Sequence, residues 1–138
     1  MKSTVLNLLS AKLAFVSLLL VGLFLLAPSH VQAQSTNDLF SAPNVSYVSS
    51  ATAIARVEAK CLELKDNYVS LNAQSQAYND NVVKYSFYTA ILDKLNEGKT
   101  TKESLEAGLK VFGTDAASSL SKSNMQAYRL EAINLLRQ

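Results

Sequence analysis

Few side chains in this sequence are of the types that carry out chemistry in proteins. The 138 residues include one histidine, His30, and one cysteine, Cys61. Histidine is the commonest general base and metal ligand, and a catalytic thiolate normally needs such a base beside it. The carboxylates are scattered, and none belongs to the dense run of Asp, Asn and Gly that a calcium loop requires. We therefore predict no catalytic, cofactor-binding or metal site, and no enzymatic activity.

The tripeptide Gly98-Lys99-Thr100 matches the end of a phosphate-binding loop. That motif needs another glycine five residues earlier, where this chain has Asp93. The motif also follows a strand, whereas the residues before Gly98 have a helical pattern. Gly98 and Thr100 instead fit the end of one helix and the cap of the next.

Three further side chains stand out because of where they fall in the pattern. Cys61 lies on the apolar side of a predicted helix, where a small buried thiol is the simplest interpretation and an intermolecular disulfide the alternative. Glu58 and Lys65 lie on the same side, seven residues apart, and each is expected to reach an opposite charge on a packing helix or to reach solvent. Lys84, in the first turn of the following helix, is expected to stay exposed.

Tyrosine is the commonest aromatic residue of the chain, and it suits half-buried positions and interfaces because its ring is apolar and its hydroxyl polar. Tyr78 falls in a polar connector, which makes it the best candidate for a surface contact. The six tyrosines are Tyr47, Tyr68, Tyr78, Tyr85, Tyr88 and Tyr128.

The leading segment decides the compartment of the protein. The segment has a basic start that contains Lys2 and Lys12. An unbroken apolar run follows over residues 13–27. A short polar tail with small residues then leads to Ala33, as in a secretory signal peptide. We predict a signal peptide over residues 1–33, cleaved after Ala33. A retained membrane anchor is the alternative. Fifteen helical residues, however, span only about 22 Å, which is short of the roughly 30 Å hydrocarbon core of a bilayer.

Removal of this segment changes what the composition means. Thirteen basic residues include Lys2 and Lys12, so eleven remain against eleven acidic ones, and His30 is lost as well. A neutral chain with interspersed signs offers no basic surface for nucleic acid or anionic lipid. We expect a secreted or periplasmic protein with no nucleic-acid partner and no stable membrane insertion after cleavage.

Helical periodicity dominates the first half of the remaining chain. Residues 34–44 are polar without a period and are predicted to be a flexible lead-in. Between residues 45 and 71 apolar pairs recur every seven residues, which predicts an amphipathic helix capped by Asn44 or Ser46. A strand over residues 45–48 is the alternative for its start. The apolar pairs are Tyr47-Val48, Ile54-Ala55, Cys61-Leu62 and Tyr68-Val69.

The phase of the pattern shifts near residue 81, which favours a hairpin of two antiparallel helices over one helix through residues 45–97. Asn79 or Asp80 is the expected cap of the second helix. Its apolar side is expected to carry Tyr85, Tyr88, Leu92 and Leu95, with Phe87 and Ile91 beside them.

Two shorter helices are predicted to follow. Thr100 and Glu103 have the spacing of a capping box at the start of the first of them. Gly108 lies on the apolar side of this helix, where the close approach of another helix would compensate its low helix propensity. The last helix is expected to begin near Ser123.

These elements predict an all-α domain over residues 45–138, a small bundle of about four helices with a long antiparallel hairpin and two shorter helices. We expect an exported, non-enzymatic protein-interaction module that binds another exported protein or itself. The alternative is a carrier of a small apolar ligand between its helices. Its cavity would be lined by residues such as Phe87, Ile91, Leu109 and Leu135.

Overall fold

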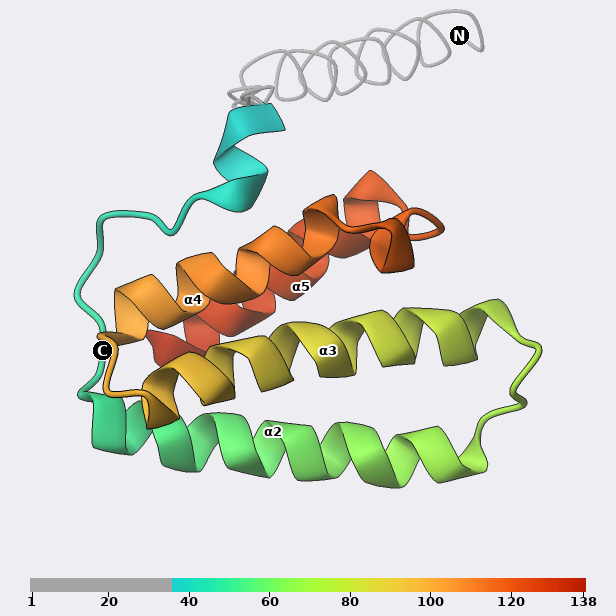
Figure 1. The fold of residues 1–138 in the computed structure, drawn as a ribbon, viewed down its shortest axis with the longest axis horizontal. Helices are drawn as coiled ribbons and strands as arrows, with labels where there is room; N and C mark the ends of the chain where they lie inside the picture. Colours follow the sequence, from blue (N-terminus) through green and yellow to red (C-terminus); the bar gives the residue numbers. More distant parts are fainter. Residues whose placement is uncertain (1–35) are drawn as a thin grey trace, which may run out of the picture. The chain divides into compact units, whose positions relative to one another are not determined.

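The computed structural model describes residues 36–138, with side chains from residue 38 onward. The predicted signal peptide and its cleavage site lie outside the described residues. Residues Gln34–Gln138 form a unit of their own. The described part of this unit is all-α, with four α-helices and no strand, as the sequence predicted (Figure 1).

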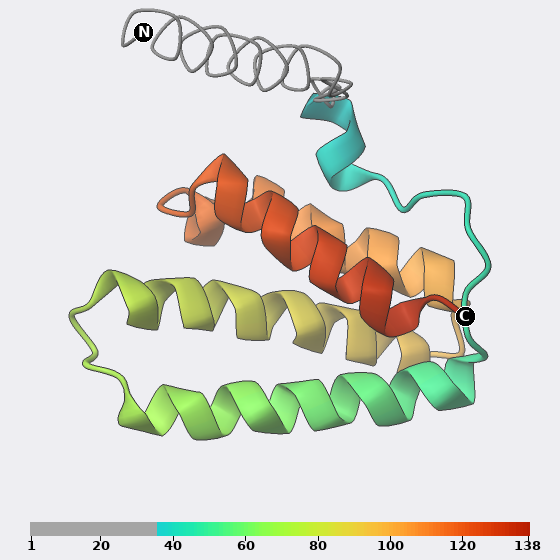
Figure 2. The ribbon, with the colours of Figure 1, turned by 180° about the vertical axis from the view of Figure 1, so that it is seen from behind.

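Two long helices form the hairpin, and two shorter ones complete the bundle. The α-helices are α2 (Ser50–Ser70), α3 (Gln76–Asn96), α4 (Thr101–Leu109) and α5 (Lys122–Leu136). The described residues also form short 3-10 helices, which are η1 (Thr36–Phe40), η2 (Lys110–Gly113) and η3 (Asp115–Ala117). α2 and α3 lie side by side and antiparallel, which confirms the hairpin over a single long helix (Figure 1). α4 packs on α3. In the view of Figure 2, α5 lies in front of α4.

The start of α2 differs from the prediction. Its cap is Ser49, whose hydroxyl oxygen accepts a hydrogen bond from the Thr52 amide, so the predicted caps Asn44 and Ser46 are wrong. The preceding residues are extended because they pair with the C-terminus. The Val48 amide donates to the Leu136 carbonyl at 2.9 Å, and Tyr47 forms an isolated β-bridge with Arg137. Backbone pairing with a segment nearly ninety residues away overrides the local helical pattern.

The later helix ends follow local capping chemistry. Ser75 caps α3 by accepting a hydrogen bond from the Tyr78 amide, so the predicted caps Asn79 and Asp80 are wrong and lie inside the helix. Gly98 takes a left-handed conformation with φ of +81° after α3. Thr100 and Glu103 form the predicted capping box at the start of α4.

The core lies between the hairpin and the shorter helices. α2 contributes three buried residues to it, Ala53, Val57 and Leu64. These positions are displaced around the helix from the predicted apolar pairs, and Leu62 and Val69 of those pairs are instead 62% and 83% exposed. The remaining buried apolar residues are Leu39, Ala42, Val83, Phe87, Tyr88, Ile91, Leu95, Leu105, Leu109, Phe112, Ala117, Leu120, Ala132, Ile133 and Leu136. Leu39 and Ala42 fall in the segment that was predicted to be a flexible lead-in.

α3 and α4 approach each other closely at Gly108. A Cβ atom at this position would lie 2.5 Å from Cγ1 of Ile91 and 3.0 Å from the Phe87 carbonyl oxygen. Only glycine leaves room for this contact, which confirms the compensation expected from the sequence.

Candidate functional site

The main polar cluster of the described bundle surrounds Glu131 on α5. One carboxylate oxygen of Glu131 lies 2.6 Å from the Lys84 ammonium, and the other lies 2.9 Å from that of Lys60. The Tyr88 hydroxyl donates a hydrogen bond of 3.2 Å to the same carboxylate. Lys60 also pairs with Glu63, at 2.9 Å. The cluster therefore links α2, α3 and α5 through charged side chains.

The pKa shifts in this cluster favour the ordinary charge states of Glu131, Lys60 and Tyr88 near neutral pH. Burial acts to raise the pKa of Glu131, but the hydrogen bonds and charges of Lys84 and Lys60 outweigh it and lower that pKa. Burial acts to lower the pKa of Lys60, but Glu63 and Glu131 outweigh it and raise that pKa. Burial and the Glu131 charge raise the pKa of the Tyr88 hydroxyl. An ionised acid, a protonated amine and a neutral phenol stabilise one another here, and none is activated as a base or nucleophile.

Lys84 was expected to stay exposed, and the structure corrects this. Its side chain is only 16% exposed, because it pairs with Glu131 and lies 4.8 Å from the centre of the Tyr128 ring. The first-turn position was inferred from a helix start at Asn79 or Asp80, whereas α3 begins at Gln76 and Lys84 lies well inside it, where its partner comes from α5.

Cys61 is half-buried between α2 and α3. Burial raises the pKa of its thiol, a hydrogen bond with the Thr89 side chain opposes this rise, and the charges of Asp93 and Glu58 add to it. The thiolate fraction at neutral pH is therefore lower than that of a free cysteine.

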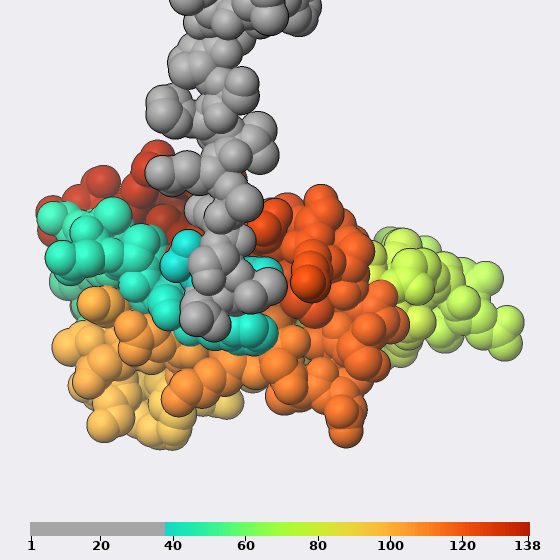
Figure 3. All heavy atoms as spheres, turned by 90° about the horizontal axis from the view of Figure 1, so that it is seen from above, coloured from blue at the N-terminus to red at the C-terminus, as the bar shows by residue number. Residues whose placement is uncertain are grey.

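A groove lies on the distal half of the hairpin, where the two helices extend past the core. It has a volume of about 420 Å³ and is lined by Lys65, Tyr68 and Val69 of α2 and by Val82 and Tyr85 of α3. The last buried residue of α2 is Leu64 and the first of α3 is Val83. The hairpin tip beyond them, yellow-green in Figure 3, projects past the shorter helices.

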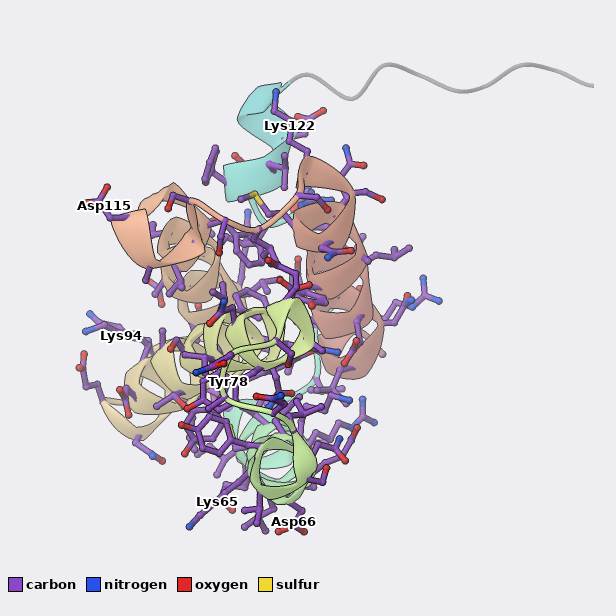
Figure 4. The ribbon with its side chains drawn as sticks, turned by 90° about the vertical axis from the view of Figure 1, so that its right-hand side faces the viewer. Lys65, Asp66, Tyr78, Lys94, Asp115 and Lys122 are labelled. Atoms are coloured by element: carbon purple, nitrogen blue, oxygen red, sulfur yellow. The ribbon has the colours of Figure 1, made fainter. Side chains whose placement is uncertain are left out.

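The two helices are held together at the groove by an aromatic contact. The rings of Tyr68 and Tyr78 lie 4.7 Å apart at 34°, and their hydroxyl groups are hydrogen-bonded to each other. Tyr78, predicted as the best surface tyrosine, is half-buried in the first turn of α3. Lys65 and Asp66 point away from the bundle on α2 (Figure 4). In the wall of the groove, Tyr68 is therefore in contact with Tyr78 of α3, and Lys65 lies at the outward-facing edge.

Glu58 and Lys65 are exposed on α2, and neither forms an ion pair with another residue of the described chain. Of the two outcomes expected from the sequence, the structure shows contact with solvent. Leu62, which lies between them along the helix, is exposed as well.

The residues predicted to line an internal ligand cavity occupy a closely packed region. Phe87, Ile91 and Leu109 are fully buried, and the Phe87 ring stacks on Phe112 with 4.9 Å between the centres. Leu135 is half-buried on α5.

Sequence reasoning did not identify the groove, although it contained a signal for it. The apolar pairs on α2 cover a larger part of the helix surface than one core-facing side needs. The last of them, Tyr68-Val69, also lies after the last buried residue of that helix.

Other kinds of site have little support among the described residues. Within residues 38–138, no group of three His, Cys, Asp or Glu side chains is placed to hold a metal ion. Every buried side-chain nitrogen or oxygen atom in the same range has a hydrogen-bond partner. None of the described helices combines the length and apolar character needed to cross a bilayer. Comparison of the chain with protein-family models, with curated proteins and with solved structures finds no match.

Proposed function

We propose that this protein is exported and acts, without enzymatic activity, as a helical protein-interaction module. The observation that carries the proposal is the groove on the distal hairpin, where apolar and aromatic side chains from α2 and α3 face solvent. Apolar side chains gathered on a surface and rimmed by charges are typical of protein-binding sites. Tyrosine at such a site supplies contact area at a low cost in side-chain entropy.

The proposed export rests on the leader and agrees with where the core lies. The proposed cut after Ala33 would leave the unit Gln34–Gln138 whole. The first buried residue in the described range is Leu39, so cleavage would remove none of the described core. Mass spectrometry of the protein from its native host should find Gln34 as the first residue. A native protein that retains His30 would contradict both the cleavage and the compartment.

The absence of enzymatic activity is part of the proposal, and the Glu131 cluster supports it. Acid, amine and phenol groups converge in this cluster, and the pKa shifts of Lys60, Tyr88 and Glu131 oppose acid–base exchange near neutral pH. The cluster instead resembles a structural clamp between three helices.

The interaction role is tested by affinity capture with a matched pair of variants. Val69→Glu places a charge at the groove, and Leu130→Glu places the same charge at an exposed leucine on α5 that does not line the groove. We expect the wild type and Leu130→Glu to retain the same dominant partner, whether another protein or a differently tagged copy of this chain, and Val69→Glu to lose it. Equal recovery with both variants would show that the groove is not the binding surface.

The volume of the groove favours a second candidate function, the binding of a small apolar ligand. About 420 Å³ lies within the usual range of ligand sites, roughly 300–1,000 Å³. Titration with a fluorescent apolar probe should show saturable binding that Val82→Trp abolishes by filling the groove. Binding that is unchanged by Val82→Trp would rule out this site.

A further inference from the structure

A stripe of exposed residues runs along α2 with the spacing of a helix-pairing surface. Its members recur at alternating intervals of four and three residues, as in the seam of a coiled coil. They are Ala51, Ala55, Glu58, Leu62, Lys65 and Val69, and all six are exposed. We call this set the α2 stripe. It lies on a different side of the helix from the buried residues Ala53, Val57 and Leu64.

We infer that the α2 stripe pairs with the same stripe of a second copy, antiparallel about a two-fold axis close to Leu62. This rests on the proposed interaction role and narrows it to one partner. Two observations carry it, the order of the charges in the stripe and the order of its large and small side chains.

The charges of the stripe are self-complementary only in the antiparallel arrangement. Glu58 and Lys65 are seven residues apart, about 10 Å along the helix, and Leu62 lies almost midway between them. A two-fold axis near Leu62 brings Glu58 of each copy level with Lys65 of the other, which forms two equivalent ion pairs. Parallel pairing in register would instead place Glu58 against Glu58 and Lys65 against Lys65.

The side-chain sizes lead to the same arrangement. The first part of the stripe is small, with Ala51 and Ala55, and its last part carries Lys65 and Val69. Antiparallel pairing sets the bulky end of one stripe against the small end of the other. The groove adjoins the bulky end, because Lys65 and Val69 belong to both. The paired surface therefore extends from α2 onto the groove.

The test is sedimentation equilibrium of the protein expressed from the 138-residue sequence, in low salt and with reductant. We expect a reversible monomer–dimer equilibrium with a dissociation constant on the order of 10–100 μM, because the surface of a single helix is small for a stable interface. Reductant excludes a disulfide through Cys61 as the link.

Charge reversal makes the test specific. Glu58→Lys and Lys65→Glu each turn both ion pairs into repulsions, so each should weaken dimerisation about tenfold or more. The double variant E58K/K65E restores opposite charges and should return the constant to within about threefold of wild type. Leu62→Glu should also weaken the dimer, whereas Leu130→Glu, at a leucine of similar exposure outside the stripe, should not.

Circular dichroism of each variant checks that the bundle remains folded, which the exposure of the substituted residues favours. A chain that stays monomeric at millimolar concentration overturns the inference, and so does a dimer that the double variant fails to restore. If the chain is monomeric but Val69→Glu still loses another captured protein, only self-pairing fails and the interaction role stands. If neither association is found, both fail.

Discussion

The contact between α3 and α4 makes Gly108→Ala an informative substitution, because two effects of opposite sign compete there. Alanine has a higher helix propensity than glycine, by about 1 kcal/mol, and this would stabilise α4. Against this, the added methyl group would lie 2.5 Å from Cγ1 of Ile91 and 3.0 Å from the Phe87 carbonyl oxygen. Ile91 is fully buried, and the carbonyl belongs to the backbone of α3, so neither atom can move aside at low cost.

Overpacking of this kind destabilises a core by about 1–3 kcal/mol. We therefore expect Gly108→Ala to lower the free energy of unfolding by about 1 kcal/mol net, which corresponds to a fall in Tm of about 4–8 °C for a domain of this size. The measurement is thermal and urea unfolding followed by circular dichroism.

Gly113→Ala is the matched control, since its nearest atom would be Cε1 of Phe40 at an ordinary distance of 3.7 Å. Its φ does not lie in the left-handed region, so alanine should be neutral or stabilising by about 0.4–1 kcal/mol. A Gly108→Ala protein as stable as Gly113→Ala would refute the close approach of α3 and α4.

Two further substitutions test the clamp and the cap, and alkylation of Cys61 tests the placement of the thiol. Glu131→Gln should cost about 1–2 kcal/mol at pH 7, since it leaves Lys84 and Lys60 without their shared carboxylate, in a site that is partly open to solvent. Because folding lowers the pKa of Glu131, the stabilisation by this carboxylate is complete above its unfolded pKa and is lost as the pH falls through its folded pKa. The free energies of unfolding of wild type and variant should therefore converge in urea titrations below about pH 4. Thr100→Ala should cost about 1 kcal/mol by removing the capping box, and NMR titration should show the lowered pKa of Glu103 returning towards its ordinary value. Iodoacetamide should alkylate Cys61 in the native protein about tenfold or more slowly than in the unfolded chain at the same pH, because burial raises the thiol pKa, and equal rates would contradict its placement.

The sequence predicted those features that depend on neighbouring residues. The capping box at Thr100 and the glycine that ends α3 follow from local chemistry and were confirmed. Gly108 indicated the close approach of another helix, which was confirmed, but did not indicate that this helix is α3. The start of α2 was placed too early, because residues 46–48 pair with the C-terminus and no local pattern shows this partner. Lys84 was expected to be exposed for the same reason, since its partner Glu131 is supplied by another helix.

The apolar side of α2 was the least predictable feature, because the helix carries two apolar surfaces. Periodicity combines Leu62 and Val69 with residues that face α3, and it cannot tell which of the two surfaces the rest of the chain covers. That decision depends on how α5 and α3 pack. The groove and the α2 stripe therefore depend on the positions of these helices and not on the pattern of α2 alone.

The ion pairs of α2 indicate that the α2 stripe does not contribute to the packing of the bundle. Lys60 is bound by Glu63 and Glu131. Glu58 and Lys65 have no such partners in the described chain, and the exposed Leu62 contributes little to the core. We therefore expect Leu62→Glu to change the free energy of unfolding by no more than about 0.5 kcal/mol, as is usual for surface substitutions. Urea unfolding at low protein concentration, where the chain is monomeric, provides the measurement. A loss of more than about 2 kcal/mol would mean that Leu62 belongs to the fold of the monomer, and its exposure could then not be taken as a sign of a binding surface.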